Sequence, residues 1–299
     1  MSRRLLLDTY SLIYRAYFAL PRTIVDAQQR PVNAVHGYLD MTARLATSQR
    51  PDEIVHVYDH DWRPEGRTSV YPGYKADRPP DPEALPPQFD FLRDALDALG
   101  ATQAEAPYWE ADDGIAALCA QAGPNERLDI VTGDRDLFAL VRDPVVRVLF
   151  TVKGVSELAV FDEAAVLEKH GVPPTRYVEY AILRGDASDG LPGVKGVGEK
   201  TARALVAAYP DLDSMLADAN ADPPQGEPLA RSRRLAESLR TASEYIEAMR
   251  SVVPTRADVE VRVWRGAGDA KRLDELAENG GLGGPIRRLG QAVVAPAED

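Results

Sequence analysis

The sequence predicts an α/β fold with a central, mostly parallel sheet flanked by helices, and two observations carry this prediction. First, short apolar segments rich in leucine or β-branched residues alternate with longer stretches of helical periodicity, at Arg4 to Leu7, Ile54 to Tyr58 and Leu128 to Thr132. Second, an aspartate directly follows the first two segments, and Gly133 and Asp134 follow the third. Such alternation is typical of βαβ units, which build parallel sheets.

Other segments supply further helices and strands. Residues 89–99 have the apolar spacing of a helix that ends at Gly100. Val145 to Phe150 and Leu158 to Phe161 are typical of strands, and Val259 to Trp264 predicts a last one. After about residue 173 the pattern becomes helical, which indicates an appended lobe.

A chain of 299 residues is long enough for one core and a smaller lobe. We expect the core over residues 1–180, with a loop-like insertion at about 62–88. The helical lobe is expected over 181–260, and residues 261–299 are expected to pack back on the core.

Acidic residues outnumber basic ones by 47 to 35, which gives a formal net charge of -12 at pH 7. Taken alone, this balance argues against a nucleic-acid partner. A net charge does not say where the carboxylates lie, however. If many of them gather at one point, they form a site.

The composition also limits the compartment and the metal chemistry. The single cysteine, Cys119, excludes an internal disulfide and a cysteine-based zinc site, and it favours a reducing, cytoplasmic location. No apolar run is long enough for a signal peptide or a membrane span, so we expect no membrane partner. The four histidines are scattered, so any metal must be held by oxygen, which favours Mg²⁺ or Mn²⁺.

Aspartates close the three predicted central strands. Ligands of parallel sheets bind at the carboxyl ends of the strands, so the fold itself should bring Asp8, Asp59 and Asp134 to one edge. This expected convergence is the first functional signal in the chain.

Further carboxylates fall near the same edge: Glu110, Asp112 and Asp113 at a helix start, Asp136 two residues after Asp134 in an extended segment, and Asp186 and Asp189 in a turn. Helix dipoles and turn capping explain single acids at such places. Nine carboxylates exceed that need and could hold two divalent ions, the arrangement used for phosphodiester hydrolysis. A phosphatase of the haloacid dehalogenase type would need a second aspartate at position 10, where Tyr10 stands.

A glycine-rich segment in the lobe reads as a helix-hairpin-helix. Its glycines, Gly193, Gly196 and Gly198, allow a tight turn whose backbone N–H groups can point at a phosphate. Lys195 and Lys200 add positive charge within reach of the same backbone. This combination favours DNA phosphate binding without sequence readout over a plain helix-helix turn.

The proline-rich segment Trp62 to Pro87 interleaves cations with aromatic rings and should protrude as a loop. The residues concerned are Arg63, Arg67, Tyr71, Tyr74, Lys75 and Arg78. Lys75 and Arg78 are spaced to share a helix face. A flexible arm that becomes ordered around single-stranded nucleic acid has this composition.

Together, these motifs resemble the bacterial 5′-nuclease family, which includes flap endonucleases and the 5′-3′ exonuclease domain of DNA polymerase I. The resemblance runs in family order from about residue 4 to residue 253. It is carried by the strand-end aspartates, by Glu-Ala-Asp-Asp at 110–113, by Thr-Gly-Asp-Arg-Asp at 132–136, and by Gly-Asp-Ala-Ser-Asp-Gly-Leu-Pro-Gly-Val-Lys-Gly-Val-Gly-Glu-Lys-Thr-Ala at 185–202. Tyr-Lys-Ala-Asp-Arg at 74–78 falls in the position of the family's arch.

The resemblance implies a PIN-like core, a helical arch over the active site and a helix-hairpin-helix lobe that grips duplex DNA. It implies that all nine carboxylates ligate two divalent ions, directly or through water, and that Lys75 and Arg78 are catalytic cations at the scissile phosphate. A K⁺ ion on the carbonyls of Val194 and Val197 is implied by position only. Gly190 departs from the family, which usually has asparagine there.

The implied activity is two-metal hydrolysis of DNA with 5′ flaps, ends or RNA-DNA hybrid, in replication and repair, by a monomeric enzyme that stands alone without a polymerase. Two alternatives stay open. A PIN-type ribonuclease would share the acidic core, although the arch and the hairpin argue against it. A non-catalytic DNA-junction binder should lack some of the ligand positions, whereas all nine are present.

Overall fold

The chain folds around one seven-stranded sheet with the order β6-β5-β4-β1-β2-β3-β7. The computed structural model describes residues 2–294, and the side chains of residues 2–292. Five strands are parallel, and the edge strands β6 and β7 run antiparallel to their neighbours. The strands are β1 (Ser2–Asp8), β2 (Glu53–Tyr58), β3 (Thr102–Glu105), β4 (Glu126–Thr132), β5 (Val146–Thr151), β6 (Leu158–Phe161) and β7 (Arg262–Arg265).

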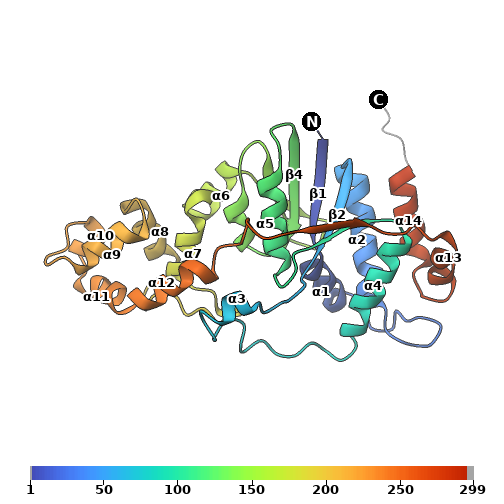
Figure 1. The fold of residues 1–299 in the computed structure, drawn as a ribbon, viewed down its shortest axis with the longest axis horizontal. Coiled ribbons are helices and arrows are strands. Elements are labelled where there is room, and N and C mark those ends of the chain that lie inside the picture. Colours follow the sequence, from blue (N-terminus) through green and yellow to red (C-terminus); the bar gives the residue numbers. More distant parts are fainter. Residues whose placement is uncertain (1, 295–299) are drawn as a thin grey trace.

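The two faces of the sheet are covered by different helices (Figure 1). Along β1, Leu5 and Leu7 point to one face and Leu6 to the other, as the alternation of a strand requires. The first face packs against α1 (Thr9–Ala19), α2 (Asn33–Gln49), α4 (Pro86–Ala98), α13 (Ala270–Glu278) and α14 (Gly283–Val294). The second face packs against α5 (Ala111–Gln121), and its core continues into the lobe.

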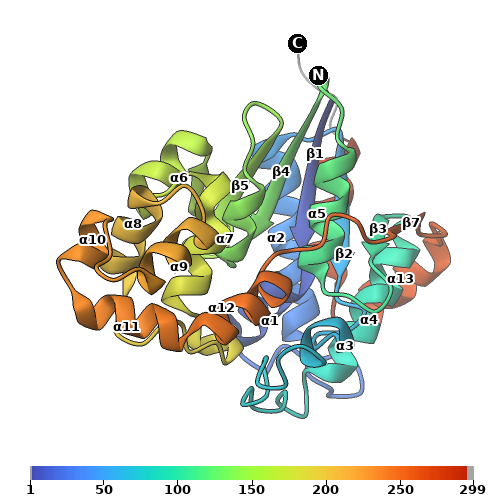
Figure 2. The ribbon, with the colours of Figure 1, turned by 60° about the vertical axis from the view of Figure 1, so that its left-hand side comes forward.

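A helical lobe adjoins the β6 side of the sheet and is seen most clearly in Figure 2. Its apolar side chains belong to the same buried cluster as those of the second sheet face. The helices that follow β6 on this side of the sheet are α6 (Glu163–His170), α7 (Tyr177–Arg184), α8 (Glu199–Ala208), α9 (Leu212–Asn220), α10 (Glu227–Ala230), α11 (Arg233–Thr241) and α12 (Ser243–Val252). Within residues 2–294, no helix is both long and apolar enough to cross a membrane.

The predicted α/β class and its strands are confirmed, with differences at three elements. Strand β3 was not predicted, because its four residues, Thr-Gln-Ala-Glu, carry almost no apolar signal. Strand β7 begins at Arg262, three residues after the predicted start at Val259. Helix α4 begins at Pro86, because proline is tolerated in the first turn of a helix.

The proline-rich segment differs most from its prediction. Only α3 (Glu65–Thr68) is helical between β2 and α4, and Lys75 adopts a left-handed backbone with φ 53°. Lys75 and Arg78 therefore do not share a helix face. The segment also packs inward, since Arg67, Tyr74 and Lys75 are all buried.

Asp129 on β4 holds the amino-terminal side of the sheet together. Its buried carboxylate accepts hydrogen bonds from Arg3 Nε at 2.6 Å and from Arg147 Nε at 2.9 Å. Arg127 Nε lies 3.5 Å away. One carboxylate thus pairs with arginines from three neighbouring strands.

We predict that Asp129→Asn lowers the free energy of unfolding by about 3 kcal/mol, because it leaves partly buried arginines without a counter-charge. Urea unfolding measures the change. Asp94→Asn is the matched control, since Asp94 pairs with Arg272 at an exposed site, and we expect it to cost less than about 1 kcal/mol. Equal losses for the two variants would contradict this account.

Candidate active site

Three strand ends place aspartates at the same edge of the sheet. Strand β1 lies between β4 and β2, so Asp8, Asp59 and Asp134 follow neighbouring strands, as predicted. Asp8 is fixed by two donors, the backbone N–H of Ser11 at 3.1 Å and Thr132 Oγ1 at 2.7 Å. Asp59 accepts a hydrogen bond from the N–H of Ala111 at 2.6 Å, which ties β2 to the start of α5.

The segment after β4 turns rather than staying extended. Thr132 Oγ1 accepts from the N–H of Asp134, and Asp134 Oδ1 accepts from the N–H of Asp136, both at 2.9 Å. A 3₁₀ helix then begins at Asp136. The extended geometry predicted for this pair is therefore wrong, because local side-chain hydrogen bonds close a turn.

A small pocket opens where these elements meet the lobe. Its acidic lining is Glu110, Asp112, Asp136 and Asp189. Arg67, Tyr74 and Leu191 also line it, together with residues 252, 253 and 255 at the end of α12 and just beyond it. Three sequence-distant segments thus contribute carboxylates to one cavity: the start of α5, the turn after β4 and the turn that contains Asp189.

Burial and mutual repulsion hold these carboxyls away from their ordinary acidity. Burial raises the pKa of Asp8 to about 7 and that of Asp59 to about 6, with repulsion from neighbouring carboxylates adding to both. Burial, with Asp134 as the largest like-charged neighbour, also raises the pKa values of Asp112 and Asp136 well above the usual range. Asp186 and Asp189 add to the repulsion at Asp136.

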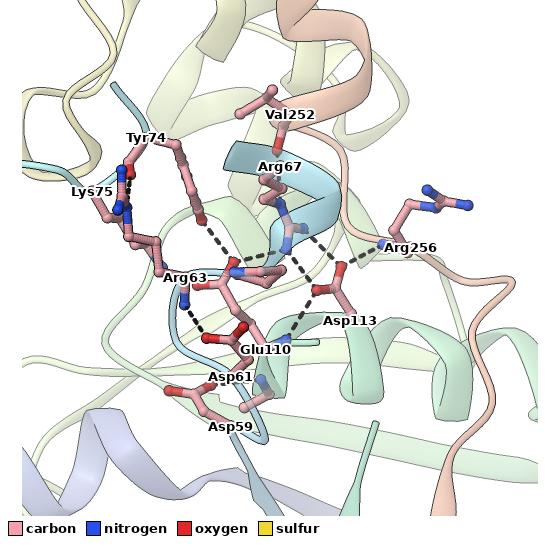
Figure 3. Close-up of polar contacts among 12 residues, drawn as sticks. Asp59, Asp61, Arg63, Arg67, Tyr74, Lys75, Glu110, Asp113, Val252 and Arg256 are labelled. Carbon is pink, nitrogen blue, oxygen red and sulfur yellow. Dashed lines mark hydrogen bonds and ion pairs between the residues drawn. The ribbon is translucent and has the colours of Figure 1, made fainter. Parts of the chain in front are cut away.

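Lys75 and Arg78 of the proline-rich segment form ion pairs with two carboxylates of this pocket, and Figure 3 shows the surroundings of the first of them, Glu110. Lys75 Nζ forms an ion pair with Glu110, whose other oxygen accepts from Tyr74 Oη at 2.7 Å. Arg78 Nη2 binds Asp189 Oδ1 at 2.6 Å, and the backbone N–H of Lys75 donates to the Asp189 carbonyl at 2.9 Å. Within residues 2–294, no three acidic, histidine or cysteine side chains converge closely enough to hold a metal ion in this arrangement.

Arg63, Arg67 and Tyr74 were predicted to contact DNA, and the structure gives them other partners. Arg67 is buried, and its guanidinium binds Glu110 and Asp113. Tyr74 is buried against Glu110, and Arg63 binds the carbonyls of Tyr74 and Pro72. The burial of Arg67 corrects its assignment, and its sequence offered no signal for this, because its partners lie more than 40 residues away.

Asp113 also departs from its predicted role. It is fully buried, and its carboxylate accepts hydrogen bonds from Arg67 Nη1 and Nη2 at 2.7 Å and from the N–H of Arg256 at 2.8 Å. It therefore faces protein donors rather than the pocket, which Asp112 lines.

The hairpin in the lobe forms as predicted between α7 and α8. Gly193 and Gly196 have left-handed φ values of 67° and 79°, which favour glycine. Val194 and Val197 are buried, whereas Lys195 and Lys200 are exposed, so the apolar side chains anchor the hairpin and the cations face solvent.

The local backbone conformation and packing explain why residue 190 is glycine. Its φ is 70°, and a Cβ at this position would lie 2.5 Å from the carbonyl oxygen of Gly73. The turn that carries Asp186 and Asp189 therefore packs directly on the proline-rich segment.

The parallel sheet, the acidic strand ends and the adjoining hairpin lobe indicate the class of protein, a nuclease with an α/β fold and an acidic active site. Two family models match the chain: the 5′-3′ exonuclease N-terminal resolvase-like domain over residues 3–171 and the 5′-3′ exonuclease C-terminal SAM fold over residues 172–274. The chain belongs to the 5′-3′ exonuclease family, which confirms the resemblance.

Relatives of matching length support this assignment. A 5′-3′ exonuclease of Streptomyces coelicolor is 44% identical over 95% of this chain and 98% of its own length. One of Mycobacterium tuberculosis is 40% identical over 96% of each.

Solved structures share the fold at low identity. A bacteriophage T5 flap endonuclease complex with DNA and metal ions has a TM-score of 0.65 at 16% identity and covers 98% of this chain and 100% of that one. The catalytic core of Rad2 in complex with DNA substrate has a TM-score of 0.62 at 17% identity, with coverages of 98% and 91%.

We predict that Mg²⁺ stabilises the protein more as the pH rises from about 5.5 to about 8. A carboxyl whose folded pKa is raised adds stability below its unfolded pKa and loses this contribution as the pH rises through about 6 for Asp59 and about 7 for Asp8. A cation replaces the lost proton, so the melting temperature in Mg²⁺ minus that in EDTA should grow to about 5 °C.

Subtracting the melting temperature in EDTA from that in Mg²⁺ cancels the contribution of the two buried histidines to the pH dependence. Burial lowers the pKa of His56 to about 3 and that of His170 to about 4, so both destabilise the fold at acid pH whether or not Mg²⁺ is present. A melting-temperature difference that stays constant across this pH range would contradict the assignment of proton-competing carboxylates.

Proposed function

We propose that this chain is a structure-specific 5′ nuclease that hydrolyses phosphodiester bonds of DNA at 5′ ends and flaps. The observation that carries the proposal is the acidic pocket between the sheet edge and the hairpin lobe, lined by carboxylates from α5, the β4 turn and the turn before the hairpin. Membership of the 5′-3′ exonuclease family supports it. The proposed units are a nuclease core over 1–180, a DNA-binding lobe over 181–260 and a C-terminal segment over 261–299.

The residues at the edge suit two divalent cations. Oxygen is their only donor type, which fits Mg²⁺ or Mn²⁺. Burial, with repulsion from neighbouring carboxylates, raises the pKa values of Asp8, Asp112 and Asp136, and a bound cation would favour their charged forms. We assign them as ligands, directly or through water: Asp8, Asp59, Glu110, Asp112, Asp134, Asp136, Asp186 and Asp189. When bound, divalent cations supply a water of lowered pKa and a clamp on the phosphate. Ligation requires these side chains to approach one another more closely than they do here.

The basic side chains have two proposed roles, one at the scissile phosphate and one at the backbone phosphates of the duplex. Lys75 and Arg78 form ion pairs with Glu110 and Asp189 in this structure. When DNA binds, the same two cations can pair with the scissile phosphate and offset the charge that develops there. Lys195, Lys200 and the N–H groups of the hairpin face solvent and can hold backbone phosphates of duplex DNA. A K⁺ ion at the carbonyls of Val194 and Val197 would neutralise the same phosphates.

The decisive experiment uses a 5′-labelled flap duplex incubated with Mg²⁺, Mn²⁺ or EDTA, with product sizes read on a gel. We expect cleavage near the flap junction with either metal and none with EDTA. Matched single-stranded RNA and RNA-DNA hybrid substrates test the ribonuclease alternative, which predicts preferential cleavage of RNA. Binding of the flap without cleavage in any metal would support the non-catalytic alternative.

We predict that Asp136→Asn lowers the cleavage rate by on the order of 100-fold or more while flap-DNA binding persists, because it removes an oxygen ligand but no DNA contact. Single-turnover cleavage and fluorescence anisotropy measure the two quantities. Asp274→Asn, an exposed change on α13, is the control and should keep full activity. Full activity of Asp136→Asn would exclude Asp136 from the metal site.

We predict that replacing Lys195 and Lys200 with alanine weakens duplex binding without changing the rate at saturating DNA. Each lost phosphate contact should reduce the slope of log Kd against log salt by about 1. Lys271→Ala, an exposed lysine on α13, is the control. An unchanged salt slope would remove the hairpin from the DNA interface.

A further inference from the structure

Arg67 connects three parts of the chain that are distant in sequence. It lies in α3 at the base of the proline-rich segment, and its side chain is 4% exposed. Figure 3 shows its guanidinium between the start of α5 and the end of α12. Because an arginine so deeply buried must be paired, its partners define its role.

Every nitrogen of the Arg67 guanidinium has an acceptor. Nη1 donates to Glu110 Oε2 and to Asp113 Oδ2, and Nη2 donates to Asp113 Oδ1, all at 2.7 Å. Nε donates to the carbonyl of Val252 at 2.9 Å. The contact with Asp113 is a bidentate fork, the strongest form of an arginine-carboxylate pair.

The donors around Asp113 leave little room for a cation. Besides Arg67, the N–H of Arg256 binds Oδ1 at 2.8 Å, and the N–H of Glu110 binds Oδ2 at 3.2 Å. Each carboxylate oxygen therefore already accepts two hydrogen bonds. Among the described residues, none donates a hydrogen bond to the carboxylate of Asp112, which lines the pocket.

The charges at this point balance within the protein. Glu110 and Asp113 contribute two negative charges, and Arg67 and Lys75 contribute two positive ones. The rings of Tyr74 and Trp109 lie 5.8 and 5.7 Å from the guanidinium carbon of Arg67 and shield it further. Loss of one partner would leave an uncompensated charge in a buried position.

We infer that Arg67 is a positioning residue of the nuclease site and that Asp113 is its counter-ion rather than a metal ligand. The pair fixes the first turn of α5, which carries Glu110 and Asp112, against the base of the proline-rich segment. The bonds to Val252 and Arg256 extend the same clamp to the chain leaving the lobe. The inference rests on the proposed function, because the clamp acts through the proposed ligands.

The test compares Arg67→Lys, Arg67→Gln, Asp113→Asn, their double variant Arg67→Gln/Asp113→Asn, and Asp112→Asn. Mn²⁺ binding is measured by electron paramagnetic resonance, and kcat and KM are measured on the flap substrate. Circular dichroism identifies any variant that fails to fold. Arg272→Gln is the matched control, because Arg272 also bridges two carboxylates, Asp94 and Glu275, but at an exposed site.

We expect Arg67→Gln and Asp113→Asn each to lower kcat by about 10 to 100-fold, with little change in KM, and to keep the number of bound Mn²⁺ ions. The double variant should be no worse than either single variant, because both remove the same clamp. Arg67→Lys should recover part of kcat, and it remains informative if the glutamine variant does not fold. Asp112→Asn should lose Mn²⁺ outright.

Two results overturn the inference: loss of an Mn²⁺ ion by Asp113→Asn with normal binding by Arg67→Gln, or an unaltered kcat for Arg67→Gln. Fully additive losses in the double variant also contradict it. A wild-type chain that cleaves no flap overturns the proposed function as well, whereas an active wild type with an unaltered Arg67→Gln overturns the positioning role alone.

Discussion

Like charges gathered at one edge of a sheet repel each other, and most of this structure follows from how that repulsion is balanced. The strand order places Asp8 and Asp59 side by side in a buried setting that raises the pKa of Asp8 to about 7. Desolvation and mutual repulsion both oppose ionisation there, so a nearby cation favours the charged form of these carboxyls. The proline-rich segment brings Lys75 and Arg78 to the neighbouring carboxylates, which explains why it packs inward instead of protruding.

The position of the acidic residues also decides whether the negative net charge excludes a nucleic-acid partner. A net charge of -12 argues against a nucleic-acid partner only if the acids are spread over the DNA-binding surface. Here four carboxylates line one pocket, whereas Lys195 and Lys200 of the hairpin are exposed beside the buried Val194 and Val197. Local patches, rather than the net charge, must then supply DNA affinity, and such affinity is sensitive to salt.

Elements with a local signal could be predicted from the sequence, and elements fixed by distant partners could not. The strands that end at Asp8 and Thr132 could be predicted from their runs of leucine and β-branched residues. Because the carboxyl ends of parallel strands meet at one edge of a sheet, the acidic residues at these ends are then expected to lie together. Strand β3 is too short and too polar to be seen. Lys75 has a left-handed backbone, and its side chain pairs with Glu110, 35 residues away, which is a contact that no local pattern encodes.

The Glu-Ala-Asp-Asp motif shows why residue type alone does not assign a role. Three acids within four residues look equivalent in sequence, yet Asp112 lines the pocket while Asp113 lies fully buried on Arg67. The difference arises because adjacent helical residues point about 100° apart, so only one can face the sheet edge. A lysine at position 67 could neutralise Asp113, but it could not serve two carboxylates and a carbonyl in one plane. The planar fork of arginine can, and this geometric demand is what makes the residue specific.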